Sequence, residues 1–132
     1  MDGAGIVIVS HSGKLSTGLA ELLHQVAPNV QVAVASASSE TLGTSAESIR
    51  SAIFEMPQSH HVIVLFDLGS SLLNAEVALE LLDSATQARV HLVDAPLVEG
   101  AVAAAVALQS GLSWEEAVRQ AQSARMTPKI AT

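Results

Sequence analysis

The stretch Gly5-Ile-Val-Ile-Val-Ser-His11 is an almost continuous apolar run that ends on a histidine. Its β-branched side chains predict a strand that is covered on both faces, as in a parallel sheet. Three later runs have the same character. Four strands are therefore expected, at Gly5–Ser10, Val30–Ser36, Val62–Asp67 and Val90–Asp94.

Helical patterns fill the connections between these runs. The first is an apolar stripe from Leu15 to Val26, and the second is a helix that runs from a Thr44–Glu47 capping box to about Met56. The third shows a repeat of Leu73, Val77 and Leu81. An Ala-rich helix over Val98–Gln109 follows, and a last helix over Trp114–Arg125 begins after a Ser113–Glu116 capping box. The alternation predicts an α/β fold with a mainly parallel sheet of about four strands. For a chain this short we expect the strand order 2-1-3-4, and right-handed crossovers would then place helices on both faces. The Ala-rich helix indicates close packing against the sheet or against a second subunit.

Length and composition narrow the class of protein. The 132 residues suit one domain, 1–132, with a patternless tail from about residue 126. The net charge of -7, with two Phe and one Trp, disfavours nucleic-acid binding, because phosphate backbones attract basic and aromatic side chains. No cysteine is present, and no apolar run is long enough to cross a membrane. We therefore expect a cytoplasmic protein without disulfides or thiolate metal sites.

The position of each histidine indicates where chemistry can occur. Ligands of open parallel sheets bind beyond the carboxyl ends of the strands. His11 directly follows the first strand and lies at that edge, whereas His60 and His61 precede the third strand at the opposite edge. Asp67 ends the third strand, which borders the first in the predicted order, and is therefore a better neighbour for His11 than Asp94, which ends the fourth strand. A carboxylate on one ring nitrogen leaves the other free as a nucleophile.

Two predicted helix starts at the same edge could hold an anion. The segments Gly43-Thr44-Ser45 and Gly69-Ser70-Ser71 would present backbone N–H groups and hydroxyls to phosphate oxygens. The simpler interpretation remains open at this point. A histidine after a strand is often an ordinary loop residue, and Asp67, Thr44 and the two serines are all common at helix starts.

Other familiar sites fit the sequence poorly. Ser12-Gly13-Lys14-Leu15 has neither the glycine spacing nor the Ser or Thr of a P-loop, and no G-x-G-x-x-G follows the first strand. A phosphorylated-aspartate receiver would need acidic residues where Ser10 and His11 stand. No G-x-S-x-G elbow of a serine hydrolase is present. No ligand spacing for a metal links the other histidines to His11, so neither a metal nor a cofactor is expected.

Four motifs in order resemble the phosphotransfer subunit of phosphoenolpyruvate-dependent dihydroxyacetone kinase, which is similar to mannose-type IIA domains of the bacterial sugar phosphotransferase system. They lie in Gly5–Ser12, Leu42–Ser45, Phe66–Ser70 and Ala95–Gly100. The resemblance implies that His11 is phosphorylated by the histidine phosphocarrier protein, that Asp67 orients its ring, and that the phosphoryl group passes to ADP on a separate kinase subunit. It also implies a homodimer.

The resemblance leaves alternatives open. A mannose-type IIA domain would pass the group to a sugar-transporter IIB partner, and a regulatory module would use phosphorylation only to change partner affinity. Mannose-type relatives carry a longer D-L-W-G-G-S-P stretch, so the short Asp67–Ser71 segment favours the dihydroxyacetone branch. Some members are fused to their phosphoryl donors. Because this chain ends after one predicted domain, we expect its donors to be separate proteins.

Overall fold

The computed structural model describes residues 3–35 and 45–130. Strands and helices alternate through most of the chain, as predicted. The elements are β1 (Ala4–Val9), α1 (Gly13–Val26), β2 (Gln31–Ala35), α2 (Ala46–Phe54), β3 (His61–Phe66), α3 (Gly69–Glu80), α4 (Ser84–Gln87), β4 (Val90–Val93), α5 (Leu97–Gln109), α6 (Trp114–Ser123) and the 3₁₀ helix η1 (Ala124–Met126). The short α4 is an addition to the sequence prediction. Among the described residues, no helix is long and apolar enough to cross a membrane.

The four strands form one parallel sheet in the order β2-β1-β3-β4, which confirms the predicted topology. β1 lies at the centre, with Val9 paired to Ala35 of β2 on one side and to Phe66 of β3 on the other. The register therefore brings the ends of β1 and β3 to the same level of the carboxyl edge. Residues that follow Val9 and Phe66 must lie close together.

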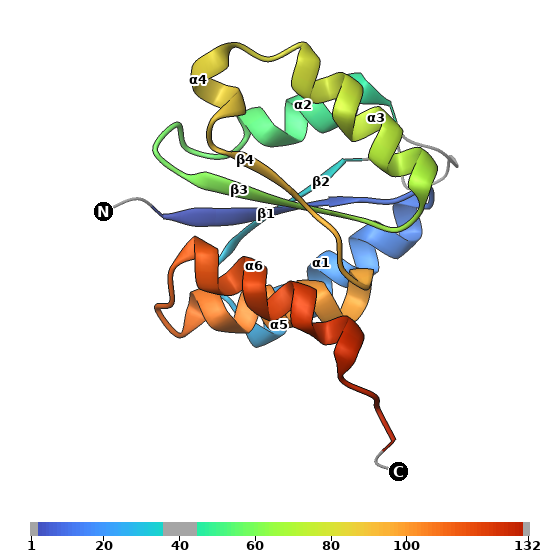
Figure 1. Cartoon of the computed structure of the whole chain (residues 1–132), viewed down its shortest axis with the longest axis vertical. Helices are drawn as coiled ribbons and strands as arrows, with labels where there is room; N and C mark the ends of the chain where they lie inside the picture. Colours follow the sequence, from blue (N-terminus) through green and yellow to red (C-terminus); the bar gives the residue numbers. More distant parts are fainter. Residues whose placement is uncertain (1–2, 36–44, 131–132) are drawn as a thin grey trace.

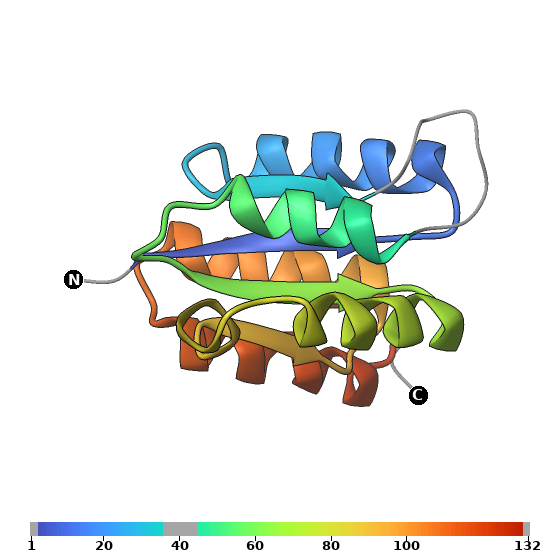
Figure 2. The same ribbon diagram turned by 90° about the horizontal axis from the view of Figure 1, so that it is seen from above.

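Helices cover both faces of the sheet (Figure 1, Figure 2). On one face, α1, α5 and α6 pack against side chains such as Ile6 and Ile8. On the other face, α2 and α3 pack against Val7, Val9 and their neighbours. Successive residues of β1 point to opposite faces, and both sets are fully buried, which explains why the run is apolar throughout.

The start of α2 differs from the predicted capping box. The helix begins at Ala46, and the N-cap is Ser45, whose hydroxyl accepts the N–H of Ser48. Ser48 completes a capping box with Ser45, so Glu47 lies in the first turn without that role. Thr44 lies outside the described residues. Thr44 and Glu47 have the same spacing as Ser45 and Ser48, which made the two registers hard to separate from the sequence.

The Ala-rich helix α5 packs inside the chain rather than presenting its alanines to a neighbour. Ala101, Ala104, Ala105 and Ala107 are buried against the sheet and α6. Of the two interpretations that the sequence left open, close packing against the sheet therefore accounts for these small residues. The prediction of a homodimer then depends on the family resemblance alone.

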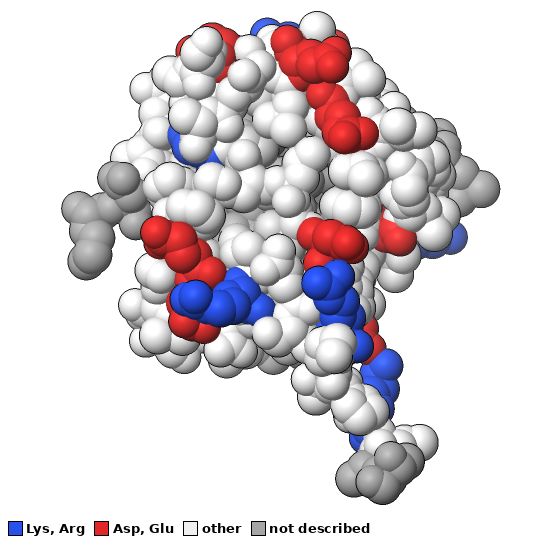
Figure 3. Space-filling model, viewed as in Figure 1, with Lys and Arg blue, Asp and Glu red and all other residues white. Residues whose placement is uncertain are grey.

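The apolar repeat of the third helix pattern does not form the buried face of α3. The repeat Leu73, Val77 and Leu81 lies on the exposed side of α3, while Ala75 and Ala78 are buried. The surface carries the acidic excess of 13 Asp and Glu over 6 Lys and Arg, and acidic side chains gather over α3 (Figure 3).

Candidate functional site

Asp67 and His11 meet at the carboxyl edge of the sheet, as their places after β3 and β1 predict. The backbone N–H of Asp67 donates to the carbonyl oxygen of Val9 at 3.2 Å, which continues the pairing of the two strands by one step. The carboxylate then turns back across β1. Its Oδ2 accepts the backbone N–H of His11 at 3.0 Å and the hydroxyl of Ser10 at 2.9 Å. Asp67 thus fixes the backbone at the point where the chain leaves the sheet.

Ser71 connects the carboxylate to the imidazole ring. The Ser71 hydroxyl oxygen lies 2.8 Å from Asp67 Oδ1 and 2.9 Å from His11 Nδ1, whereas Oδ1 and Nδ1 are 3.4 Å apart. An ionised carboxylate only accepts hydrogen bonds, so the Ser71 hydroxyl donates its proton to Oδ1. Its oxygen must then accept from His11, which places the ring proton on Nδ1. The geometry therefore selects one tautomer and leaves a lone pair on Nε2.

The other ring nitrogen faces the surface. Ser70 places its hydroxyl oxygen 2.6 Å from His11 Nε2, and the His11 side chain is 31% exposed. Ser70 itself is exposed at the start of α3. With the proton on Nδ1, Nε2 accepts a hydrogen bond from Ser70. Among the described residues, the Ser70 hydroxyl is the hydrogen-bond partner that a group approaching Nε2 would displace.

The pKa of Asp67 is lowered from 3.8 to about 2. Burial is the largest influence and raises the pKa, but it is outweighed by the hydrogen bonds that the carboxylate accepts from the Ser71 hydroxyl, the His11 backbone, the Ser10 hydroxyl and the His11 ring. The Leu68 backbone N–H also donates to Oδ1 at 2.8 Å. Asp67 is therefore ionised at neutral pH, as the tautomer argument requires.

Two helices begin beside the ring. α1 starts at Gly13, two residues after His11, and α3 starts at Gly69, next to Ser70. The first N–H groups of a helix have no partner within the helix and carry the positive end of its dipole. This edge is consequently suited to an anion attached to Nε2.

The remaining predicted site residues are placed differently. Ser45 serves as the cap of α2 and is not among the described hydrogen-bond partners of His11, and the other predicted α2 residue, Thr44, is not described. Gly69 is the first residue of α3, and the space that a side chain would occupy there is open. The site therefore does not need a glycine to avoid a clash, and Gly69 contributes only its backbone. Asp94 is 86% exposed and lies 3.7 Å from Arg125, away from the histidine.

Sequence reasoning missed the roles of Ser71 and Ser10. Both side chains are fully buried, which is unusual for serine and marks them as parts of a hydrogen-bonded network. One signal was available for Ser71, because it follows Asp67 by four residues at the start of a helix. A carboxylate before the helix and a hydroxyl in its first turn can then meet.

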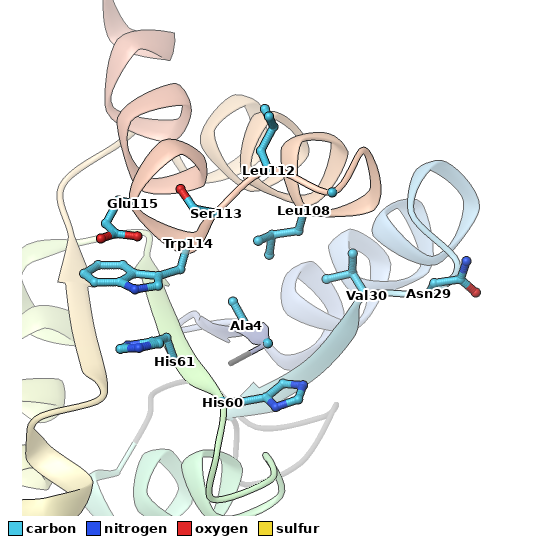
Figure 4. Close-up of a pocket in the computed structure, with 12 residues that line it drawn as sticks. Ala4, Asn29, Val30, His60, His61, Leu108, Leu112, Ser113, Trp114 and Glu115 are labelled. Carbon is cyan, nitrogen blue, oxygen red and sulfur yellow. The ribbon is translucent and has the colours of Figure 1, made fainter. Parts of the chain in front are cut away.

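The histidines of the opposite edge form a separate cluster. His61 Nδ1 lies 3.0 Å from His91 Nε2, and Trp114 stacks on the His91 ring with centroids 3.9 Å apart. His60 and His61 line a hollow of about 570 Å³ together with the start of α6 (Figure 4). In the described part of the chain, no three His, Cys, Asp or Glu residues are grouped to hold a metal ion. Among the described residues, no hydrogen bond joins His61 or His91 to a carboxylate, in contrast to His11.

The parallel sheet, with a partly exposed histidine at its carboxyl edge, can be compared with known protein families. The model of the EIIA-man family, described as the PTS system fructose IIA component, matches residues 5–118. The chain therefore belongs to the EIIA-man family.

Individual relatives narrow this class. The chain is 42% identical over 129 residues to the "PEP-dependent dihydroxyacetone kinase, phosphoryl donor subunit DhaM" of Providencia stuartii, covering 91% of this chain and 26% of that protein. It is 41% identical over 103 residues to the "PEP-dependent dihydroxyacetone kinase 2, phosphoryl donor subunit DhaM" of Listeria innocua, covering 76% of this chain and 82% of that protein. The chain thus spans about a quarter of the Providencia relative and most of the Listeria relative.

A solved structure agrees with the fold. The crystal structure of EF1359, a protein of unknown function, matches with a TM-score of 0.84 and 31% identity, over 92% of this chain and 94% of that one. The predicted fold and family are both confirmed.

Proposed function

We propose that this chain is a phosphohistidine carrier that supplies a dihydroxyacetone kinase. His11 would accept a phosphoryl group from the histidine phosphocarrier protein and pass it to ADP bound on the nucleotide-binding subunit of the kinase. The observation that carries this proposal is the arrangement of Asp67, Ser71 and His11, which leaves Nε2 unprotonated and facing solvent. The names of the relatives support the choice of kinase.

The chemistry follows from the tautomer. The Nε2 lone pair of His11 attacks the phosphorus, a new N–P bond forms, and the bond between phosphorus and the donor nitrogen breaks. The donor leaves with that electron pair. No proton leaves His11, because Nδ1–H is already directed at Ser71. The product ring is a cation, and the ionised Asp67 stabilises it.

Positioning and charge supply most of the catalysis of phosphoryl transfer. The hydroxyl of Ser70 would turn from Nε2 to a phosphoryl oxygen, and the backbone N–H groups of Gly69 and Ser70 would donate to the same oxygens. The helix starts of α1 and α3 favour the negative charge. No cofactor takes part in these steps. The reverse transfer to an acceptor uses the same contacts in the opposite order.

Two acceptors have to be distinguished. The family description names a sugar-system IIA component, which favours a IIB domain of a transporter as the alternative acceptor. The relatives named above and the short Asp67–Ser71 segment favour ADP on a kinase subunit. The sequence shows no nucleotide-binding motif, so ADP would have to be bound by the partner.

Reconstitution tests the proposal. The chain is incubated with phosphoenolpyruvate, the general phosphotransferase components, the ADP-loaded kinase subunit and the dihydroxyacetone-binding subunit, with one component omitted at a time. We expect label on His11 before the kinase is added, followed by ATP formation and loss of the label. If the labelled chain discharges only to a IIB domain, the sugar-transport alternative replaces this proposal.

A further inference from the structure

A row of large apolar side chains is exposed along α3. Leu73, Val77 and Leu81 are 64%, 48% and 54% exposed, and Leu68, just before the helix, is 56% exposed. A single exposed apolar residue needs no explanation, but a continuous row on one helix face is typical of an interaction surface. We call Leu73, Val77 and Leu81 the α3 row.

The exposure follows from how α3 packs. Its inward face carries Ser71, Ala75 and Ala78, all at most 1% exposed. Turning the helix to bury the row instead would move Ser71 away from Asp67 and His11, which it contacts. The contacts of Ser71 therefore fix the rotation of α3 that leaves the row exposed to solvent.

The row leads directly to the candidate phosphorylation site. Ser70 lies three residues before Leu73, and residues at this spacing share a face of a helix. The Ser70 hydroxyl is 2.6 Å from His11 Nε2. A partner protein bound to the α3 row would thus reach His11 Nε2, the proposed nucleophile, at the N-terminal end of the helix.

Acidic residues flank the row. Glu76 and Glu80 are exposed on α3, and Figure 3 shows acidic side chains over this helix. The surface therefore suits a partner with an apolar contact bordered by Lys or Arg. A second copy of this chain would present the same acidic residues through its own α3 and not the complementary basic ones, so it fits this surface poorly.

We propose that the α3 row is the docking surface for the protein that donates a phosphoryl group to His11. This inference rests on the proposed function and adds the surface and the chemistry of the partner. The partner presents an apolar patch to Leu73 and Val77, and its basic side chains lie near Glu76 and Glu80. Docking there carries its phosphoryl group to the exposed Nε2.

Charged substitutions in the row test this proposal. Val77→Lys places a charge in the middle of the row, and Val26→Lys is its matched control. Val26 is a helical valine, 38% exposed at the end of α1, on the other face of the sheet. Circular dichroism and thermal unfolding establish that both variants are folded. If Val77→Lys fails to fold, Leu73→Lys replaces it, because Leu73 is the more exposed side chain.

Two phosphoryl donors separate docking from chemistry. Phosphoramidate is a small donor that needs no protein surface, and the phosphorylated histidine phosphocarrier protein is the protein donor. For Val77→Lys we expect unchanged labelling by phosphoramidate. With the protein donor, we expect an increase of about tenfold or more in the concentration for half-maximal rate, as for loss of a central interface residue. Val26→Lys should match the unaltered chain with both donors.

Each outcome bears on one proposal. Equal kinetics of Val77→Lys and the unaltered chain with the protein donor would overturn the docking surface. Loss of phosphoramidate labelling in Val77→Lys would also overturn it, since the change would then act on the site itself. If neither donor labels the unaltered chain, the proposed function fails instead. Reversal of both flanking glutamates, Glu76→Lys with Glu80→Lys, should slow association and reduce its dependence on salt; an unchanged salt dependence would contradict the basic partner.

Discussion

Asp67→Asn is the substitution that tests the tautomer argument most directly. The side chain keeps its shape, but one carboxylate oxygen becomes an NH₂ donor. If that group takes the place of Oδ1, it donates to the Ser71 hydroxyl, which now lies 2.8 Å from Oδ1. Ser71 must then donate to His11 Nδ1, and the ring proton moves to Nε2. The nucleophilic nitrogen would be protonated while every heavy atom stays in place.

The expected magnitudes follow from the same contacts. A wrong tautomer in a comparable histidine–aspartate pair slows catalysis by about 10⁴-fold, and general acid–base effects are about 10²–10⁴-fold. We expect phosphoryl uptake to slow within this range. The lowering of the Asp67 pKa from 3.8 to about 2, at about 1.4 kcal/mol per pKa unit, corresponds to at most about 2.4 kcal/mol of stability from the ionised group.

The sign of the pH dependence can be stated from that shift. Asp67 has a lower pKa in the folded protein than in the unfolded chain, so its contribution is complete above about 3.8 and disappears as the pH falls through about 2. In the Asp67→Asn variant, the free energy of unfolding should be lower at pH 7. It should also change less than that of the unaltered chain between pH 4 and pH 2.

Rapid-quench labelling measures the transfer rate, and ¹⁵N NMR of the imidazole reports which nitrogen carries the proton. The unaltered chain should show protonated Nδ1, and the variant should show protonated Nε2. The reasoning is refuted if the unaltered chain already carries its proton on Nε2. It is equally refuted if the variant changes tautomer but takes up phosphate within about threefold of the original rate.

Three further outcomes are expected. His11→Ala should abolish acid-labile label from phosphoenolpyruvate, and label that persists would contradict the assignment of a sole site. The chain should sediment as a homodimer at micromolar concentration, as the family resemblance implies; a monomer alone would refute this. Burial and the nearby His61 lower the pKa of His91, while Glu115 opposes them, so the stability contributed by neutral His91 is complete above about pH 6.5 and is lost as the pH falls through the lower folded pKa. Trp114 is the sole tryptophan of the chain, and its fluorescence should change as the pH falls below about 6.5; a His91→Gln variant with the same profile would contradict this.

The sheet and the pairing of His11 with Asp67 could be predicted from the sequence because they depend on strand order. Once β1 and β3 are adjacent and parallel, residues that follow them must meet at one edge. The capping of α2 could not be fixed in the same way. Ser45 and Ser48 form the box, yet Thr44 and Glu47 offer the same chemistry one residue earlier. Both pairs have the same spacing of three residues, so the local pattern does not distinguish them.

The hydrogen bonds of Ser71 were also not predicted, because a serine in the first turn of a helix is ordinary and its spacing from Asp67 is a weak signal. Its role depends on the rotation of α3 about its axis, and the apolar pattern of that helix is misleading on this point. A repeat of Leu73, Val77 and Leu81 predicts a buried face by the usual rule of amphipathic helices. The observed helix buries the small residues instead.

The rotation of α3 connects the site to the surface beside it. The fully buried residues of α3, Ser71, Ala75 and Ala78, all have small side chains, so its first turn can approach the ends of β1 and β3. That approach brings Ser71 to Asp67 and Ser70 to His11. The same rotation exposes Leu73, Val77 and Leu81 to solvent, which is unfavourable unless a partner covers them. A larger residue on the buried face of α3 could rotate the helix and bury the apolar row. It would then displace the Ser71 hydroxyl that fixes the tautomer of His11. The catalytic geometry and the apolar surface therefore have one structural cause, and a change in the rotation of α3 would alter both.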